Sequence, residues 1–491
     1  MKRQAVLQVL LIIGLLTLGR DVLANGIAVK NVAFANMDLV GKSVYVVFDV
    51  SWSNSWRSSD NWDAAWVFVK FQAPGSNFWQ HATLDSANAN HQAAAGSVVS
   101  AAPDGRGVFL YSAAPQTGSV NYTSVRLRWN YGADGYAFAR SDAVQVAVQA
   151  VEMVYIPAIP FFLGSGGAES GHFYQYTDGS QSTNPYPVTS EGSIAVGTAN
   201  GNLYYGTGSG YSGDQLGPIP AAFPKGYAAF YCMKYEVSQG QYADFLNKLT
   251  GVQATNNYPT GAAGNYRWTI TGTYPSYVAA ALDRACGHLI WPYGTAYAAW
   301  AGLRPMTELE FEKACRGSAL PVANEYAWGS TSLTQLTGVT GADGSGSETP
   351  SPASANGLYG NQGALQGPAR VGIYATAGAT RAAAGAGYYG VMELSGNAME
   401  QCVSVGHPTG RAFQGTHGSG ALSAAGAPTN ADWPTYTVGT GAAGTGGRGG
   451  NWYDGSSRLP LSDRDMACDK ETDTPAGSFK VYGWRSVRTA P

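Results

Sequence analysis

Residues 300–317 read WAGLRPMTELEFEKACRG, and this stretch says more about the fold than any other part of the chain. Thr307 and Glu310 lie three positions apart, which is the spacing of a capping box at the start of a helix. Phe311 and neighbouring apolar residues can supply the buried side of that helix. We therefore expect an amphipathic helix that begins at Thr307 and ends at Arg316.

Two further helices are expected in the same part of the chain. Residues 238–249 place apolar side chains at helical spacing after Ser238, a residue type that favours the N-cap position. Residues 295–301 form a shorter helical stretch just before the capping box. Between residues 330 and 386, Gly, Ala, Ser and Thr dominate the sequence. We expect a long surface loop there, because small and polar residues are typical of connecting segments.

The region before residue 151 has a different pattern of residues. Short apolar runs at 43–48, 66–71, 125–129 and 144–151 are separated by Gly, Asn, Asp and Pro. Strands of this length with turn residues between them are typical of all-β domains. We therefore predict a β-sandwich domain over residues 25–150 and a second, mixed domain over residues 151–491.

The chain begins like a secreted protein. Lys2 and Arg3 precede an apolar run over residues 6–18, and Ala24 offers a cleavage point. We interpret residues 1–24 as a signal peptide, and an uncleaved N-terminal anchor is the alternative. No later segment is apolar enough to span a membrane. The expected location is therefore extracellular or at the cell surface, with the periplasm as the alternative compartment.

The net charge and the cysteine content indicate which partners and which cross-links to expect. The formal net charge is -3 and no basic stripe is present, which argues against a nucleic-acid partner. The chain has five cysteines at wide spacing. In an exported protein this odd number predicts one or two disulfides, with at least one thiol left over.

A series of short motifs in the second region resembles the formylglycine-generating-enzyme family, also called the sulfatase-modifying-factor family. The motifs carrying the resemblance are Met153 to Ala158, Phe162 to Ser165, Tyr235 to Leu246, Ala296 to Gly317, Tyr326 to Gly329, Glu393 to Glu400, Gly449 to Trp452 and Gly483 to Arg485. They follow the family's order over most of the C-terminal two-thirds of the chain. The resemblance implies an α+β, C-type-lectin-like fold with much irregular loop, and so a mixed fold for the whole chain.

The resemblance also allows a check for the metal ligands that the family's oxidases use. The family's oxidases hold copper with two cysteines that follow the Gly-Gly-Ser-Trp turn. Counted from Trp452, the matching positions hold Asp454 and Leu459, and neither side chain can replace a thiolate ligand of Cu(I). A related branch binds iron through histidines, but no facial triad is visible in this sequence. Copper and iron are therefore not expected, and the chain is interpreted as a non-catalytic member, a pseudoenzyme.

Calcium is the one metal that the resemblance favours. The family's loop at Glu393 to Glu400 holds Ca²⁺, so Glu393 and Glu400 would provide carboxylates while Gly396 and Ala398 would provide carbonyl oxygens. The alternative is that the two glutamates cap turns or form ion pairs. Their partners would then be Arg464, Arg485 or Arg488. Five residues at framework positions of the family are expected to form buried ion pairs that hold irregular loops: Arg304, Glu310, Arg316, Arg464 and Arg485.

A ligand groove is expected near the Gly-Gly-Asn-Trp turn. Aromatic side chains beside polar ones suit sugar or peptide contacts. The residues expected to line or flank this groove are Trp452, Tyr453, Asp454, His407, His417 and Trp433. The alternative for Trp452 is a place in the core.

Three functional hypotheses follow from the sequence. The first is a secreted, non-catalytic protein that acts in extracellular binding, adhesion or surface assembly, with a glycan or a protein as partner. The second is a diverged metal-dependent oxidase or oxygenase of the same family. The third is a structural subunit of a surface layer or filament, in which strand edges support self-assembly.

Overall fold

A computed structural model describes residues 26–177, 183–206, 212–259, 261–361, 363, 365–470 and 478–491. The expected signal peptide lies outside the described residues. The fold is mixed, with mostly strands and few helices. No described helix is both long enough and apolar enough to cross a bilayer.

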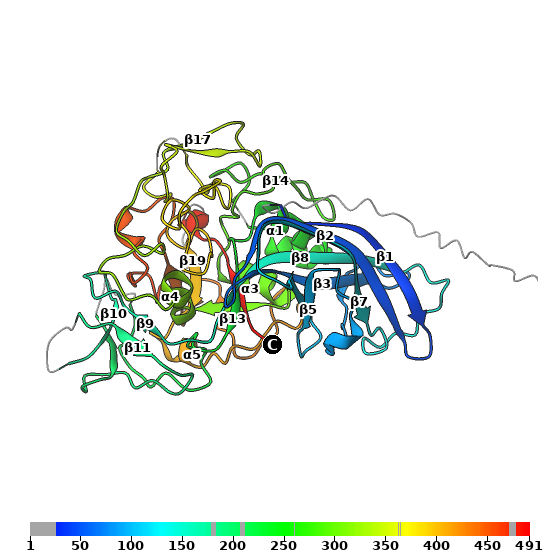
Figure 1. Ribbon diagram of the computed structural model, residues 1–491, viewed down its shortest axis with the longest axis horizontal. Helices are drawn as coiled ribbons and strands as arrows, with labels where there is room; N and C mark the ends of the chain where they lie inside the picture. Colours follow the sequence, from blue (N-terminus) through cyan, green and yellow to red (C-terminus); the bar gives the residue numbers. More distant parts are fainter. Residues whose placement is uncertain are drawn as a thin grey trace, which may run out of the picture.

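A ten-stranded sheet runs through the molecule (Figure 1). Along its main path the strands are β22 (Thr445–Arg448), β19 (Glu400–Val403), β16 (Arg304–Thr307), β23 (Ser486–Thr489), β13 (Phe230–Met233), β8 (Gln145–Ile156), β3 (Asp63–Gln72), β6 (Val108–Ser112) and β5 (Ser97–Ala101), and β4 (Gln80–His81) pairs with β3. β16 and β19 are parallel. The sheet passes without a break through residue 150, because β8 pairs with β3 on one side and with β13 on the other.

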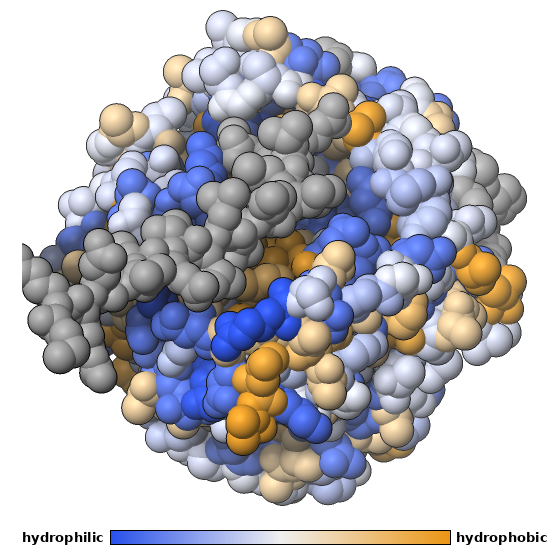
Figure 2. Space-filling model, turned by 90° about the vertical axis from the view of Figure 1, so that its right-hand side faces the viewer, coloured by the Kyte–Doolittle hydropathy of each residue, from blue (hydrophilic) through white to orange (hydrophobic). Residues whose placement is uncertain are grey.

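A second, three-stranded sheet lies beside one end of the first, on the right-hand side of Figure 1. Its strands are β1 (Ala28–Asp38), β2 (Ser43–Arg57) and β7 (Gln116–Trp129), in the order β1-β2-β7. Phe48 and Trp129 from this sheet share one apolar core with Val67 and Phe71 of β3. On the side of the molecule that faces the viewer in Figure 2, apolar residues form small patches between polar ones.

The described part of the chain contains five α-helices: α1 (Gln239–Asn247), α2 (Gly251–Asn257), α3 (Trp291–Trp300), α4 (Glu308–Arg316) and α5 (Pro408–Arg411). The capping box expected at the start of α4 is present, since the Thr307 side chain accepts a hydrogen bond from the Glu310 amide and the Glu310 carboxylate accepts one from the Thr307 amide. Ser238 likewise caps α1, as predicted. α3 begins four residues earlier than expected, with Pro292 in its first turn.

Short two-stranded sheets organise the loops. They pair β9 (Phe161–Leu163) with β11 (Tyr186–Val188), β10 (Phe173–Gln175) with β12 (Leu203–Tyr205), β14 (Ile270–Thr271) with β15 (Val278–Ala279), β17 (Gly338–Thr340) with β18 (Thr349–Ser351), and β20 (Tyr436–Thr437) with β21 (Gly441–Ala442). Between residues 330 and 386, β17 and β18 are the only strands among the described residues. The loop expected in that stretch is therefore largely what the structure contains.

The expected buried ion pairs are present in the C-terminal region. Arg304 pairs with Glu310 at 2.6 Å, Arg464 with Glu308 at 2.8 Å, and Arg485 with Glu400 at 2.8 Å. Arg316 binds Glu325 at 2.5 Å. Each guanidinium group provides hydrogen bonds and an opposite charge to a buried carboxylate. These pairs therefore hold the irregular segments of the chain in a defined geometry.

The disulfide prediction is wrong for this structure. All five cysteines are free, and four of them are buried: Cys232, Cys286, Cys315 and Cys402. Burial raises the pKa of each of these four thiols, which keeps them protonated. They act as small apolar side chains of the core rather than as cross-links.

Candidate functional site

The Gly-Gly-Asn-Trp turn is held by its own asparagine. Gly449 and Gly450 both adopt positive φ values, of 78° and 68°. Asn451 then accepts hydrogen bonds from the amides of Tyr453 and Asp454, at 2.9 Å and 3.0 Å. The side chain of Trp452 points into the core and has an exposed fraction of 0%.

The two positions that carry copper ligands in the family's oxidases are both occupied here by engaged side chains. The Asp454 carboxylate accepts hydrogen bonds from Asn451 at 3.0 Å and from Arg458 at 2.8 Å. The Leu459 side chain is fully buried. Cys468 lies among the charges of Glu308 and Arg464 instead. The geometry therefore offers no pair of thiolates after the turn.

A surface groove of about 850 Å³ lies elsewhere, beside α5. Its lining is mostly small, amide and hydroxyl side chains: Thr409, Ala412, Gln414, Thr416, Asn430, Ala431, Asp432, Trp433, Thr435 and Ala443. Asp432 shapes one wall, because its carboxylate accepts hydrogen bonds from the Gln414 amide at 3.0 Å and from the Thr416 amide at 3.2 Å. The Asn430 side-chain oxygen is buried and has no hydrogen-bond partner.

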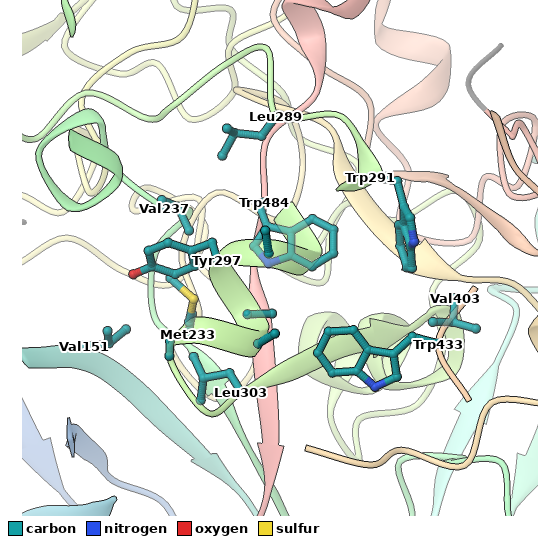
Figure 3. Close-up of a cluster of buried hydrophobic side chains, with 14 of the residues drawn as sticks. Val151, Met233, Val237, Leu289, Trp291, Tyr297, Leu303, Val403, Trp433 and Trp484 are labelled. Carbon is teal, nitrogen blue, oxygen red and sulfur yellow. The ribbon is translucent and has the colours of Figure 1, made fainter. Parts of the chain in front are cut away.

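Three of the residues expected to flank a ligand lie at or near this groove. Trp433 backs it, but its ring belongs to the buried cluster that contains Trp291 and Trp484 (Figure 3), and only 4% of Trp433 is exposed. His407 caps α5 by accepting a hydrogen bond from the Thr409 amide at 3.1 Å. The ring of His417 accepts a hydrogen bond from the Thr489 amide at 3.1 Å.

The structure does not bring all six expected ligand residues together. None of Trp452, Tyr453 and Asp454 lines the groove beside α5. Trp452 belongs to a different apolar cluster from Trp433, so its alternative place in the core is the one observed. The groove itself was missed from the sequence, since its lining residues are common loop residues that carry no distinctive pattern.

The segment expected to hold calcium contains a cluster of buried acids. Glu400 accepts a hydrogen bond from Arg485 at 2.8 Å, and Glu393 accepts one from the Gly372 amide at 2.8 Å. Glu236, which was not predicted as a calcium ligand, accepts a hydrogen bond from the Ala398 amide at 2.8 Å. Glu236 lies in the Tyr235 to Leu246 motif, so the motif could have drawn attention to it.

The charges of this cluster do not balance. Burial, opposed in part by Arg485, raises the pKa of Glu393 to about 7. Burial and the neighbouring Glu400 raise the pKa of Glu236 well above its usual value. One oxygen of Glu393 and one of Glu400 are buried and have no hydrogen-bond partner among the residues that the structure describes. The cluster therefore favours bound protons or an added cation.

Gly396 lies at the centre of this segment and has a φ of 92°. A Cβ atom there would lie 2.6 Å from the backbone oxygen of Leu358, so only glycine fits. Within the described residues, no group of three His, Cys, Asp or Glu side chains is arranged to hold a metal. Calcium at Glu393 and Glu400 would thus depend on backbone carbonyls for its other ligands.

The comparison with protein families agrees with the order of the motifs in the sequence. A family model for the sulfatase-modifying factor enzyme 1-like domain matches residues 180–490. A comparison with curated proteins gave no match to the chain. Because the matched region covers well over half of the chain, this protein belongs to the sulfatase-modifying factor enzyme 1-like (FGE-sulfatase) family.

Proposed function

We propose that this protein is an exported, non-catalytic member of its family that binds a partner outside the cell. The observation that carries the proposal is the pair of side chains after the Gly-Gly-Asn-Trp turn. Asp454 is bound by Asn451 and Arg458, and Leu459 is buried in the core. Neither residue offers the soft ligand that Cu(I) prefers.

The groove beside α5 is the proposed ligand site. Its exposed groups are amides and hydroxyls, and its one acid, Asp432, already accepts hydrogen bonds from the wall. Such a surface matches the hydroxyl and amide groups of an uncharged glycan or of a peptide backbone. Among the described residues of its lining, Asp432 is the one charged side chain, and hydrogen bonds to the wall already engage its carboxylate. An uncharged glycan is the ligand class that this lining favours.

Two measurements on the secreted protein test the absence of oxidase chemistry. Elemental analysis should find neither stoichiometric copper nor stoichiometric iron, and a cysteine-containing peptide should cause no oxygen consumption. Stoichiometric copper together with thiol-dependent oxygen uptake would show that the protein is instead a diverged oxidase.

The groove is tested by a glycan array followed by titration calorimetry. The Gln414→Ala variant removes an exposed amide from the groove and should weaken glycan binding by about two- to tenfold, as the loss of one neutral hydrogen bond predicts. Gln145→Ala, an exposed glutamine at the start of β8, is the matched control and should bind like the unaltered protein. Equal affinity in all three proteins would rule out the groove.

We also propose that the Glu393 to Glu400 segment takes up Ca²⁺. The two unpartnered carboxylate oxygens and the excess of buried negative charge support this proposal. Glu393 and Glu400 would hold the ion, together with the carbonyls of Gly396 and Ala398. Calcium should raise the melting temperature of the protein relative to EDTA, and Glu393→Gln should remove the effect. A calcium response that survives in Glu393→Gln would disprove this site.

A further inference from the structure

Lys480 occupies an unusual position close to the Gly-Gly-Asn-Trp turn. Its Nζ atom lies 4.6 Å from the ring centre of Tyr266, 3.8 Å from that of Tyr453 and 5.8 Å from that of Trp452. These are distances at which a cation is attracted by the face of an aromatic ring.

The Trp452 ring contacts both tyrosine rings. The ring centres of Tyr266 and Trp452 are 5.6 Å apart, and those of Trp452 and Tyr453 are 5.6 Å apart at an interplanar angle of 83°. Trp452 is fully buried beneath, whereas Tyr266, Tyr453 and Lys480 are partly exposed. We call these three rings the aromatic box. It has a buried floor and a side that reaches the surface.

The backbone that forms one wall of the box adopts unfavourable conformations. Tyr266 has a φ of 48°, Arg267 a φ of 63° and His288 a φ of 60°, all in the left-handed region that non-glycine residues rarely adopt. The ring centre of His288 lies 5.9 Å from that of Tyr266. Strain of this kind gathers at sites that must hold a fixed geometry for a ligand.

His288 adds a second feature to the same wall. It is 5% exposed, and its Nε2 atom is buried with no hydrogen-bond partner. Burial and the nearby Lys480 charge lower the pKa of this ring to about 4. At neutral pH the ring is therefore uncharged and does not repel a cation in the box.

We propose that the aromatic box is a binding site for the lysine ammonium group of a partner polypeptide, and that Lys480 is an intramolecular occupant which a partner lysine displaces. The box already accommodates a lysine side chain, so its size and electrostatics fit this ligand class. It shares no lining residue with the groove beside α5, and the proposal goes beyond glycan binding there.

Competition with Lys480 leads to a quantitative prediction for the affinity of a partner lysine. A ligand that must displace an internal occupant binds with an affinity reduced by the fraction of time for which the box is open. Removal of the Lys480 ammonium should therefore strengthen binding. The expected gain is at least about tenfold, if the box is closed most of the time.

The test is a tryptophan-fluorescence titration of the whole secreted chain with the peptide acetyl-Gly-Lys-Gly-amide. Lys480→Ala should bind this peptide at least about tenfold more tightly than the unaltered protein. The same peptide with an Nε-acetylated lysine lacks the charge but keeps the stem, and it should not bind. Lys480→Gln replaces Lys480→Ala if the alanine variant is unfolded. A parallel titration with n-butylammonium shows whether the ammonium group binds without a peptide backbone.

Two further variants make the test specific. Adding Tyr453→Ala to Lys480→Ala should abolish the gain, because it removes the ring nearest to the cation. Lys248→Ala is the control, since Lys248 also lies over an aromatic ring, that of Trp79 at 5.3 Å, but far from the box in the sequence and paired with Asp244. The proposal is overturned if Lys480→Ala binds no more tightly than the unaltered protein, or if the acetylated peptide binds equally well.

Discussion

Glu308 illustrates how single residues define this fold. Its buried carboxylate accepts hydrogen bonds from Arg448 at 2.9 Å and from Arg464 at 2.8 Å and 3.0 Å, and also from the Val405 amide. Burial alone would raise the pKa of Glu308, but the two arginines outweigh burial, and the pKa is lowered. A single carboxylate thereby joins α4 to the end of β22 and to the loop that carries Arg464.

Glu308→Ala should therefore destabilise the protein strongly. The substitution leaves the buried guanidinium group of Arg464 without its carboxylate partner and removes one of the two carboxylates that bind Arg448, the other being Glu312. Breaking a buried pair typically costs about 3–5 kcal/mol. Urea unfolding followed by fluorescence measures this loss. A free energy of unfolding within about 1 kcal/mol of the unaltered protein would contradict the assigned role.

The raised pKa of Glu393 predicts that the stability of the folded protein decreases as the pH rises. Its pKa rises from 4.5 in the unfolded chain to about 7 in the folded protein, so the folded state binds more protons between these values. Stability from this residue is fully present below pH 4.5 and is lost as the pH rises towards 7. Without calcium, Glu393→Gln should therefore gain stability relative to the unaltered protein by up to about 3 kcal/mol from pH 5 to pH 8.

Thermal melts in EDTA at several pH values measure that difference. The informative quantity is how the difference in melting temperature between Glu393→Gln and the unaltered protein changes with pH. Any loss of stability that does not involve proton binding is the same at each pH. A difference in melting temperature that stays constant from pH 5 to pH 8 would show that Glu393 is not the titrating group.

At the residue scale, the sequence locates single positions well but does not reveal which distant residues meet in space. Asp454 and Leu459 could be placed by counting from Trp452, since the turn fixes their positions. The aromatic box could not be found in this way. Tyr266 and Lys480 are more than two hundred positions apart, and only the folded chain brings them together.

At the scale of elements, the capping box of α4 should contribute measurably to stability. Thr307→Ala removes the side-chain oxygen that accepts the Glu310 amide and also donates to the Pro224 carbonyl at 3.0 Å. Loss of an N-cap threonine typically costs about 1–2 kcal/mol. Every residue of α4 is buried, so this loss should appear in global unfolding by urea.

Thr250→Ala is the matched comparison, because Thr250 caps α2 with the same capping-box geometry. Only Ala254 and Asn257 of α2 are buried, so the helix can fray without disturbing the core. The effect on global unfolding should be smaller than that of Thr307→Ala. A larger effect of Thr250→Ala than of Thr307→Ala would mean that the burial of a helix does not decide how much its cap contributes to global stability.

Helices with an apolar side and a capping residue could be predicted from the sequence, and α1 and α4 lie where expected. α2 was missed because its sequence, GVQATNN, has few apolar residues to reveal a period. The main strands of the N-terminal region were also predicted. The pairing of β16 with β23 and β19 was not, since short strands far apart in the chain carry no signal of their partners.

At the scale of the whole molecule, the N-terminal region and the family domain are joined by a single sheet and by buried contacts. β8 pairs with β3 from Val154 opposite Asp63 to Gln145 opposite Gln72. Lys70 of β3 donates hydrogen bonds to the carbonyls of Trp300 at 2.6 Å and Gly420 at 2.8 Å. Phe109 stacks on Tyr231 with ring centres 3.7 Å apart.

This continuity predicts that the chain from residue 25 onwards unfolds in one cooperative step. Removing residues 25–144 would expose the edge of β8 and the apolar residues that pack against β3, so the remaining fragment should aggregate or stay unfolded. Scanning calorimetry of the purified protein should therefore give one transition, with equal calorimetric and van't Hoff enthalpies. Two resolved transitions, or a soluble and folded fragment of residues 145–491, would show that the sheet joins two independently stable units. The large shared core argues against that outcome, because Trp66 and Phe68 of β3 lie in the same buried cluster as Trp300 and Leu303 of the family domain.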